Sequence, residues 1–429
     1  MILDIIRTVN FRQRLKQFLT TSLYVNASYL AVNIAVRSLL GFVFWIVVAR
    51  FYTPAEVGYS SAIISVVNYL ALLSLIGWDS SLIRFMPQAE KPGILINSCF
   101  TICSLISLVI AGIFVAGVDF WSPALAFIKG NAIFTLVFIV FTPLWALSLL
   151  IDATFIAKRR AGFALTQSVI TSSLKIPLAV LLVLFFHAFG IVASWGIALG
   201  VAIAASLFLF LPKVQHAFRP VPTLNLGQLN SKWQYSGGNY LTSLFIGAPI
   251  LILPVMVVNL LGPETNAFFY IAWMMASLLS AIVAATSLSL FAEGSHFEDK
   301  LGENVQKSFK FTFLLLVPAV ILLILIGKWL LLAFGQSYLV NGLMLFRILV
   351  LASLPVGINH IYTGVLRVRH KLKELMAIWG IIAVATLVTS YLIVPVTGII
   401  GIGYVWLGIQ SVVALYIVVF RRRLLRGGY

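Results

Sequence analysis

Long apolar stretches dominate the chain, and short polar gaps separate them. Windows of about 20 residues predict twelve such stretches, at roughly 26–51, 58–82, 94–118, 131–156, 163–186, 191–212, 236–261, 267–291, 309–327, 339–366, 374–395 and 399–420. In lipid each stretch must be a helix, because only a helix pairs all of its own backbone polar groups there. The pattern therefore predicts an all-α integral membrane protein with about twelve transmembrane helices.

Short motifs recur in the two halves of the chain and predict an internal repeat that divides it near residue 225. The segment Ala49–Glu56, which ends the first stretch, has a counterpart in Asn259–Glu264, which ends the seventh. The glycine, isoleucine and tryptophan of 190–195 recur at nearly the same offset in 401–406. Two halves in the same orientation are typical of transporters built from parallel repeats. We therefore expect two six-helix bundles.

The basic residues are sorted between the gaps. Of the 29 Lys and Arg residues, 23 lie in every second gap or in the terminal segments, and only Arg50, Lys129 and Lys328 lie in the other gaps. The positive-inside rule then places both termini in the cytoplasm, which requires an even number of spans. The formal charge of +17 is thus mostly an insertion signal for a multi-pass protein of the cell membrane, and we expect no binding of nucleic acid.

The same reading predicts the domain limits. Residues 1–25 place four cations between apolar residues at helical spacing, which fits either a cytoplasmic amphipathic helix or a plain extension of the first span. An N-terminal bundle over 26–212 and a C-terminal bundle over 236–420 follow. The cytoplasmic linker 213–235 joins them, and a basic cytoplasmic tail, 421–429, ends the chain.

Three cations remain inside the apolar stretches: Arg37, Lys175 and Arg347. Arg37 lies roughly 16 Å from the start of its span at 1.5 Å per residue, near the bilayer centre. A charge at this depth costs about 2.5–3.5 kcal/mol on insertion scales and indicates a functional residue. The acids Asp152 and Asp79 could pair with these cations and merely lock helices together. Three cations against two acids nevertheless leave excess positive charge, which an anionic ligand could neutralise.

Other residues are candidates for binding, coupling and motion. Arg84 follows the second stretch and could gather a phosphate headgroup from the inner leaflet, or serve only as a positive-inside anchor. Asp152 could bind a coupling proton or sodium ion, or simply pair with a neighbouring helix. Gly247, Pro249 and Pro254 predict a bend in the seventh stretch, which is either a hinge for alternating access or a static kink.

The sequence also lacks several kinds of site. No GxxxxGK[ST] motif is present, so ATP hydrolysis is not expected. Cys99 and Cys103 share a helix face inside one apolar stretch and are expected to be buried hydrophobes. The acids of the predicted external side, Glu56, Asp119 and Glu264, lie in separate loops, whereas acid–base catalysis on a sugar needs gathered groups. We therefore expect no catalytic residues, no metal ion and no cofactor.

A series of short motifs, taken in order, carries a family resemblance. They are Ala49–Gly58, Gly77 with Arg84 and Phe85, Gly262–Glu264, Phe268–Tyr270, Phe334–Tyr338, and Gly398, Gly401 and Gly403. With this order and spacing the chain resembles, over nearly its full length, the polysaccharide-biosynthesis flippases of the multidrug/oligosaccharidyl-lipid/polysaccharide exporter superfamily. It departs from the pattern at Ala267, where the first-half counterpart is Gly58.

The resemblance implies two six-helix bundles around a central cavity that opens alternately to either side. It also implies a substrate in which an oligosaccharide is joined by phosphate or pyrophosphate to a polyprenyl lipid. The predicted function is transfer of this lipid from the cytoplasmic to the outer leaflet during surface polysaccharide biosynthesis. Membrane lipids and the glycan polymerase and glycosyltransferases of the same pathway are candidate partners. The alternatives are a secondary drug or metabolite exporter of the same superfamily and an integral-membrane glycan polymerase.

Overall fold

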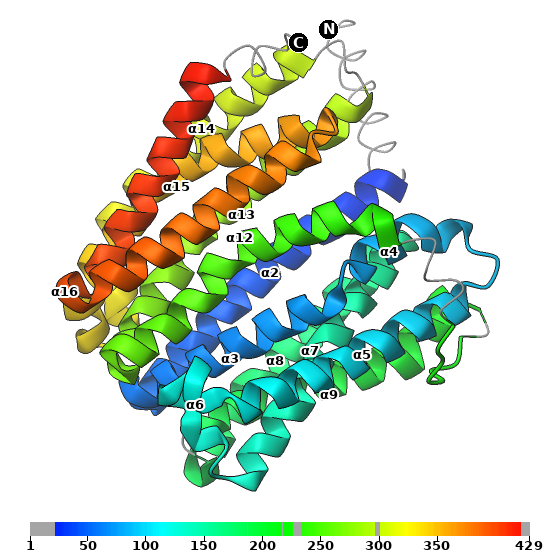
Figure 1. Ribbon diagram of the computed structural model, residues 1–429, viewed down its shortest axis with the longest axis horizontal. Coiled ribbons are helices and arrows are strands. Elements are labelled where there is room, and N and C mark those ends of the chain that lie inside the picture. The colour runs from blue at the N-terminus through cyan, green and yellow to red at the C-terminus, as the bar shows by residue number, and fades with distance from the viewer. Residues whose placement is uncertain (1–21, 187, 217, 226–232, 297–300, 422–429) are drawn as a thin grey trace, which may run out of the picture.

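The computed structural model describes residues 22–186, 188–216, 218–225, 233–296 and 301–421. These residues are overwhelmingly helical, and eleven helices are long and apolar enough to cross a membrane. Figure 1 shows them as a set of long, roughly antiparallel rods. The prediction of an all-α multi-pass membrane protein is therefore confirmed. The predicted amphipathic segment lies almost wholly outside the described residues, as do much of the linker and nearly all of the basic tail.

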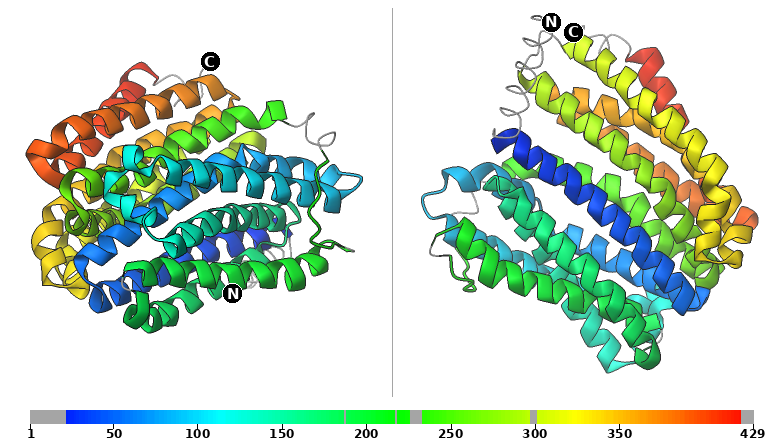
Figure 2. Two further views of the ribbon diagram at one scale, coloured as in Figure 1. Left: turned by 60° about the horizontal axis from the view of Figure 1, so that its bottom comes forward. Right: turned by 180° about the vertical axis from the view of Figure 1, so that it is seen from behind.

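The helices divide into two sets that follow the chain order. The first half contains α2 (Ser22–Phe51), α3 (Pro54–Leu75), α4 (Trp78–Phe85), α5 (Pro92–Ala116), α6 (Val118–Trp121), α7 (Ala132–Ala157), α8 (Ala161–Phe186), α9 (Ala188–Ala205) and α10 (Leu211–Val214). The second half contains α12 (Trp233–Leu261), α13 (Pro263–His296), α14 (Leu301–Phe334), α15 (Gln336–Val368) and α16 (Leu372–Phe420). Each set packs mainly within itself and forms one bundle (Figures 1 and 2). The start of α2 and the end of α16 lie at the same end of the molecule (Figure 1).

The eleven long helices agree with twelve predicted stretches because α16 contains two of them. The predicted stretches over 374–395 and 399–420 are the two arms of this helix, which meet at Gly398 with a φ of 64° and a ψ of −159°. Glycine adopts this conformation without a Cβ clash. The chain therefore changes direction at one residue, with no polar gap between the arms.

The second predicted stretch, 58–82, is too long at its C-terminal end. Helix α3 stops at Leu75, and the next two residues, Ile76 and Gly77, both take left-handed φ values, 47° and 81°, before α4 begins. The break releases carbonyl groups that need new donors. The Tyr240 hydroxyl donates to the carbonyl of Leu73 at 2.6 Å and so ties α12 to the broken helix. Hydropathy alone did not reveal this turn, because Leu75, Ile76 and Trp78 keep the turn itself apolar.

The two bundles are joined tightly at the end of the molecule opposite the start of α2. The Arg50 guanidinium donates to the carbonyl oxygens of Ala333 at 2.8 Å and Leu332 at 3.1 Å, in the last turn of α14. The buried Asn266 side chain of α13 donates to the carbonyl of Gly58 in α3 at 2.8 Å. We call this end of the molecule, where Arg50 and Asn266 join the two bundles, the closed end.

Tyr52 braces the same end within the first bundle. It lies between α2 and α3, and its hydroxyl donates to the carbonyl of Ala179 in α8 at 2.6 Å. Burial, with a smaller contribution from the nearby Glu56 carboxylate, raises the pKa of Tyr52 to about 12. The hydroxyl therefore remains a donor at any physiological pH.

Candidate functional site

A cavity of about 360 Å³ lies between the two bundles. The first bundle lines it with residues from α2, α3, α7, α8 and α9, and the second bundle with residues from α12 and α13. Its charged lining residues, Arg37, Asp152 and Lys175, all come from the first bundle. The wall from the second bundle is apolar or aromatic apart from the hydroxyls of Ser277 and Tyr270. The site is therefore strongly asymmetric.

Helical spacing brings the polar residues to the cavity. In α2, Arg37, Gly41 and Trp45 follow one another at intervals of four residues, so they share one face of the helix. In α8 the lining residues recur every three or four positions from Gln167 to Lys175. Each of these helices thus presents a polar stripe to the cavity and apolar faces to its other surroundings.

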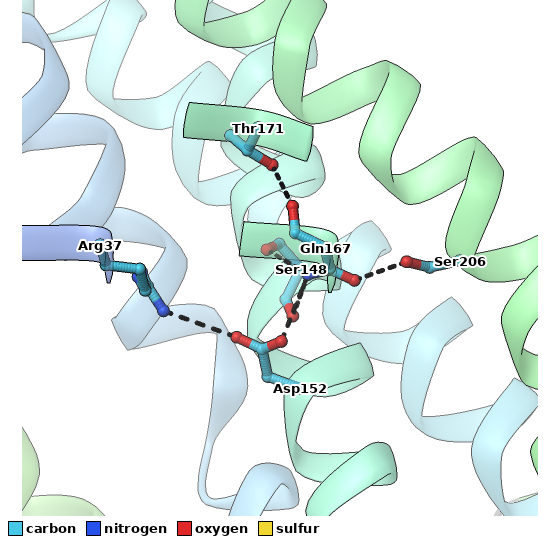
Figure 3. Close-up of polar contacts among 6 residues, drawn as sticks. All are labelled: Arg37, Ser148, Asp152, Gln167, Thr171 and Ser206. Atoms are coloured by element: carbon cyan, nitrogen blue, oxygen red, sulfur yellow. Dashed lines mark hydrogen bonds and ion pairs between the residues drawn. The ribbon is translucent and has the colours of Figure 1, made fainter. Parts of the chain in front are cut away.

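Arg37 and Asp152 form an ion pair across α2 and α7, with 3.6 Å between a guanidinium nitrogen and Oδ2 (Figure 3). Side-chain exposure differs between them, at 51% for Arg37 and 16% for Asp152. The sequence predicted Asp152 as a counter-ion, and the structure brings the two together. Arg37 marks the exposed mouth of the cavity, whereas Asp152 lies farther inside.

Asp152 is held by a second set of hydrogen bonds. The Gln167 amide nitrogen donates to Oδ1 of Asp152 at 3.4 Å and to the hydroxyl of Ser148 at 3.0 Å. The Ser206 hydroxyl in turn donates to the amide oxygen of Gln167 at 2.7 Å (Figure 3). Ser206 begins a single π-helical turn, Ser206–Phe210, a distortion that is frequent at functional sites. The network fixes the orientation of the carboxylate toward Arg37.

Lys175 has a different environment from Arg37, although both line the same cavity. Its side chain is 4% exposed, and Nζ lies 3.9 Å from the ring centre of Trp195 and 4.6 Å from that of Phe44. These cation–π contacts stabilise the ammonium group but do not neutralise its charge. Among the described residues, no carboxylate forms a salt bridge with it. Lys175 is therefore a buried amino group that has aromatic contacts but no carboxylate partner among the described residues.

The remaining predicted binding residues lie elsewhere. Arg347 is exposed on α15 and does not line the cavity, so the structure brings two of the three deep cations together and leaves the third apart. Arg84 lies in the last turn of α4, with its guanidinium 5.7 Å from the ring centre of Phe85. It too is outside the cavity. An inner-leaflet role for Arg84 stays a prediction.

The predicted hinge residues belong to a helix that the structure shows as continuous. Gly247, Pro249 and Pro254 all lie within α12, and Gly247 packs against Leu72 of α3. None of the three lines the cavity, although Ile250 in the same helix does. A role of this segment as a hinge for alternating access stays a prediction.

The sequence interpretation missed the aromatic lining of the cavity. Five rings face it: Trp45, Trp145, Trp195, Tyr270 and Trp273. Trp195 entered the sequence interpretation only as a marker of the internal repeat. The available signal was the helical spacing of tryptophan with polar residues, as in Arg37 and Trp45, inside otherwise aliphatic stretches. Within the described part of the chain, no cluster of His, Cys, Asp and Glu side chains could hold a metal ion.

Comparison with known proteins identifies the family. The sequence model of the family described as "Polysaccharide biosynthesis protein" matches residues 47–341. The chain belongs to this family. The match includes Asp152, Lys175 and the other cavity-lining residues of α3, α7, α8, α9, α12 and α13, whereas Arg37 and the other cavity-lining residues of α2 precede it. A search of curated proteins found no sequence match.

Solved structures share the fold over nearly the whole chain. The lipid II flippase MurJ in an inward closed conformation matches with a TM-score of 0.70 and 14% identity, over 91% of this chain and 87% of that one. An inward-facing multidrug resistance MATE family transporter of the MOP superfamily matches with a TM-score of 0.69 and 15% identity, over 92% of this chain and 98% of that one. The outward-facing conformation of a MATE family transporter matches with a TM-score of 0.62 and 15% identity, over 94% of this chain and 95% of that one. The predicted two-bundle transporter fold is thereby confirmed.

Proposed function

We propose that the protein is a flippase that moves a polyprenyl phosphate- or diphosphate-linked oligosaccharide from the cytoplasmic to the outer leaflet. The observation that carries this proposal is the charge of the cavity. Among the described residues that line the cavity, Arg37 and Lys175 face one carboxylate, Asp152, so the cavity carries a net positive charge when Lys175 is protonated. A phosphate group supplies the missing negative charge. The same excess argues against a cationic drug as the substrate.

The two cations suit successive contacts with a phosphate. Arg37 at the mouth presents a planar guanidinium that can donate two parallel hydrogen bonds to phosphate oxygens. Lys175, deeper in the cavity, acts as a compact point charge held by its aromatic contacts. Entry of the phosphate would exchange the Asp152 partner of Arg37 for a ligand oxygen. The anion is then shared between the two cations.

Contacts between the bundles support alternating access. The closed end seals the cavity on one side, while the 51% exposure of Arg37 and the 4% exposure of Lys175 indicate that the cavity opens toward the start of α2. With the predicted topology, that opening faces the cytoplasm. The higher TM-score with the inward-facing MATE structure than with the outward-facing one is consistent with this state.

The wall from the second bundle suits the lipid part of the substrate. Ile250, Leu251, Met274 and Leu278 face the charged residues across the cavity. Apolar surface of this kind takes hydrocarbon without loss of hydrogen bonds. The headgroup would bind the first bundle while the start of the polyprenyl chain lies along the second.

Replacement of Arg37 by glutamine tests the proposal in cells. Arg37→Gln removes a charged donor to phosphate, so export of surface polysaccharide should fall by about 10- to 100-fold, with lipid-linked intermediates accumulating in the cytoplasmic leaflet. Arg347→Gln is the matched control, because it also removes one cation from a membrane-spanning helix but lies outside the cavity. Both proteins must insert at wild-type levels. Normal export by Arg37→Gln would refute the cationic site, and loss of export by Arg347→Gln alone would relocate it to α15.

A further inference from the structure

Five aromatic residues line the cavity, and we call them the aromatic wall: Trp45, Trp145, Trp195, Tyr270 and Trp273. Ring contacts connect the first four of them. Ring centres are 5.4 Å apart for Trp145 and Trp195, and 6.3 Å apart for Trp45 and Trp195. Trp45 and Tyr270 are 4.8 Å apart and link the two bundles. The wall therefore continues from one bundle to the other across the cavity.

Packing behind the wall holds its rings in place. Trp273 contacts Trp406 with ring centres 5.2 Å apart and Phe269 at 5.5 Å. Trp145 rests on the fully buried Phe141, with 5.7 Å between ring centres. Rings fixed from behind present flat faces with little entropy to lose on binding. Such faces suit a rigid ligand ring.

Two serine hydroxyl groups line the same cavity. Ser65 donates its hydroxyl proton to the carbonyl of Ser61 at 2.8 Å, and Ser277 donates to the carbonyl of Met274 at 2.7 Å. Both side chains line the cavity. Because the proton of each is committed to its own helix, the lone pairs of the oxygen are the part left to bind a ligand. They accept hydrogen bonds from a ligand that carries hydroxyl groups.

We propose that the aromatic wall is a sugar subsite that binds the pyranose rings nearest the phosphate. The axial C–H bonds of a pyranose carry partial positive charge and meet the negative face of an indole, as other positive groups do, while its hydroxyls reach the serine oxygens. The inference rests on the proposed function, because the phosphate must sit at Arg37 and Lys175 for the adjoining sugar to reach the wall. Lys175 already contacts Trp195 at 3.9 Å, so the two subsites are contiguous.

The size of the cavity limits what this subsite can hold. A volume of about 360 Å³ is near the lower end for small-molecule pockets. It accommodates the phosphate, the start of the lipid chain and the adjoining sugar, and the rest of the lipid and of a longer glycan extends through the mouth. The wall would thus select on the sugar next to the lipid phosphate. Trp145 and Trp273 are partly exposed and belong to different bundles, so a sugar that stacks on the wall can contact both halves.

Two soluble probes separate the sugar subsite from the anion site. Geranyl diphosphate carries the phosphates alone, and geranyl diphosphoglucose adds one hexose; their affinities for purified protein in nanodiscs are measured by calorimetry. We expect the wild-type protein to bind the glucose-bearing probe more tightly. Trp273→Leu should abolish this advantage, a change of about three- to tenfold, without altering the affinity for geranyl diphosphate. Arg37→Gln should weaken both probes equally.

Two more variants make the outcome decisive. Trp145→Leu removes a ring of the same wall from the other bundle and should repeat the result if Trp273→Leu does not fold. Trp329→Leu is the matched control, because Trp329 is 64% exposed on α14, away from the cavity, and should leave both affinities unchanged. Equal binding of the two probes by wild-type protein, or equal weakening of both by the wall variants, would overturn the sugar subsite while leaving the anion site intact. Failure of wild-type protein to bind either probe would refute the proposed function and this inference together.

Discussion

At the scale of single residues, the sequence revealed how deep a charge lies but not which way it faces. Hydropathy placed Arg37, Lys175 and Arg347 inside membrane-spanning stretches, and all three do lie in long helices. Depth follows from the distance along a helix, whereas the facing direction depends on packing between helices. The sequence therefore did not reveal that Arg347 is exposed on its helix outside the cavity. The contribution of Ser206 was equally hidden, because it depends on a π-helical turn.

The pairing of Arg37 with Asp152 makes a prediction about competition. If the carboxylate occupies Arg37 until a phosphate displaces it, Asp152→Asn should raise the affinity for geranyl diphosphate by about two- to fivefold. Asparagine keeps an acceptor for Gln167 but loses the charge. Asp119→Asn is the control, because it breaks an ion pair with Lys129 (2.7 Å) remote from the cavity. Unchanged or weaker binding of the probe by Asp152→Asn would contradict the competition.

The same variant tests whether Asp152 binds a coupling proton or sodium ion. We propose this role because Asp152 is a carboxylate that lines the cavity. Transport by reconstituted Asp152→Asn should lose its dependence on a proton or sodium gradient if the carboxylate carries the coupling ion. Retention of that dependence would remove Asp152 from this role.

At the scale of elements, the closed end depends on a close crossing of α3 and α13. Gly58 lies against the backbone of Pro263, and a Cβ at this position would overlap the Pro263 carbonyl oxygen. Asn266, fully buried, donates to the Gly58 carbonyl and to the Ser61 hydroxyl. This explains why the two repeats differ here: Gly58 meets the backbone of the other bundle, so a side chain is excluded. The sequence showed the difference at Ala267, but only the packing supplies its cause.

Gly58→Ala should therefore push the two bundles apart at the closed end. Overpacking of this kind costs about 1–3 kcal/mol, so we expect a lower Tm and a longer distance between spin labels at Ala55→Cys and Gln336→Cys, measured by electron spin resonance. Gly112→Ala in α5 is the matched control, because nothing lies within 4 Å of a Cβ added there. An unchanged Tm together with an unchanged label distance would show that the crossing is not tight.

At the scale of the whole molecule, most of the architecture could be predicted from the sequence. Lipid admits few backbone conformations, so apolar length alone indicates helices, and the repeated motifs indicate two halves. Helix boundaries were predicted less accurately where the backbone turns without a polar gap, as at Ile76 and Gly398. The cavity could be predicted only through family resemblance, and its aromatic wall was missed although the helical spacing of Trp45 from Arg37 was a signal for it. The arrangement of both depends on contacts between helices distant in the sequence, and a local pattern shows only which residues share a helix face.

Transfer between leaflets by purified protein tests the central claim. This claim is that a cavity with net positive charge carries a glycan, joined to a lipid through negatively charged phosphate groups, across the membrane. Proteoliposomes would contain a polyprenyl diphosphate-linked oligosaccharide in both leaflets, and a membrane-impermeant glycosidase would digest only the outer pool. We predict that wild-type protein makes nearly all of the lipid digestible, whereas Arg37→Gln and Lys175→Met leave the inner pool protected. Continued protection of the inner pool with wild-type protein under every ion gradient applied, or wild-type rates in both variants, would contradict the account.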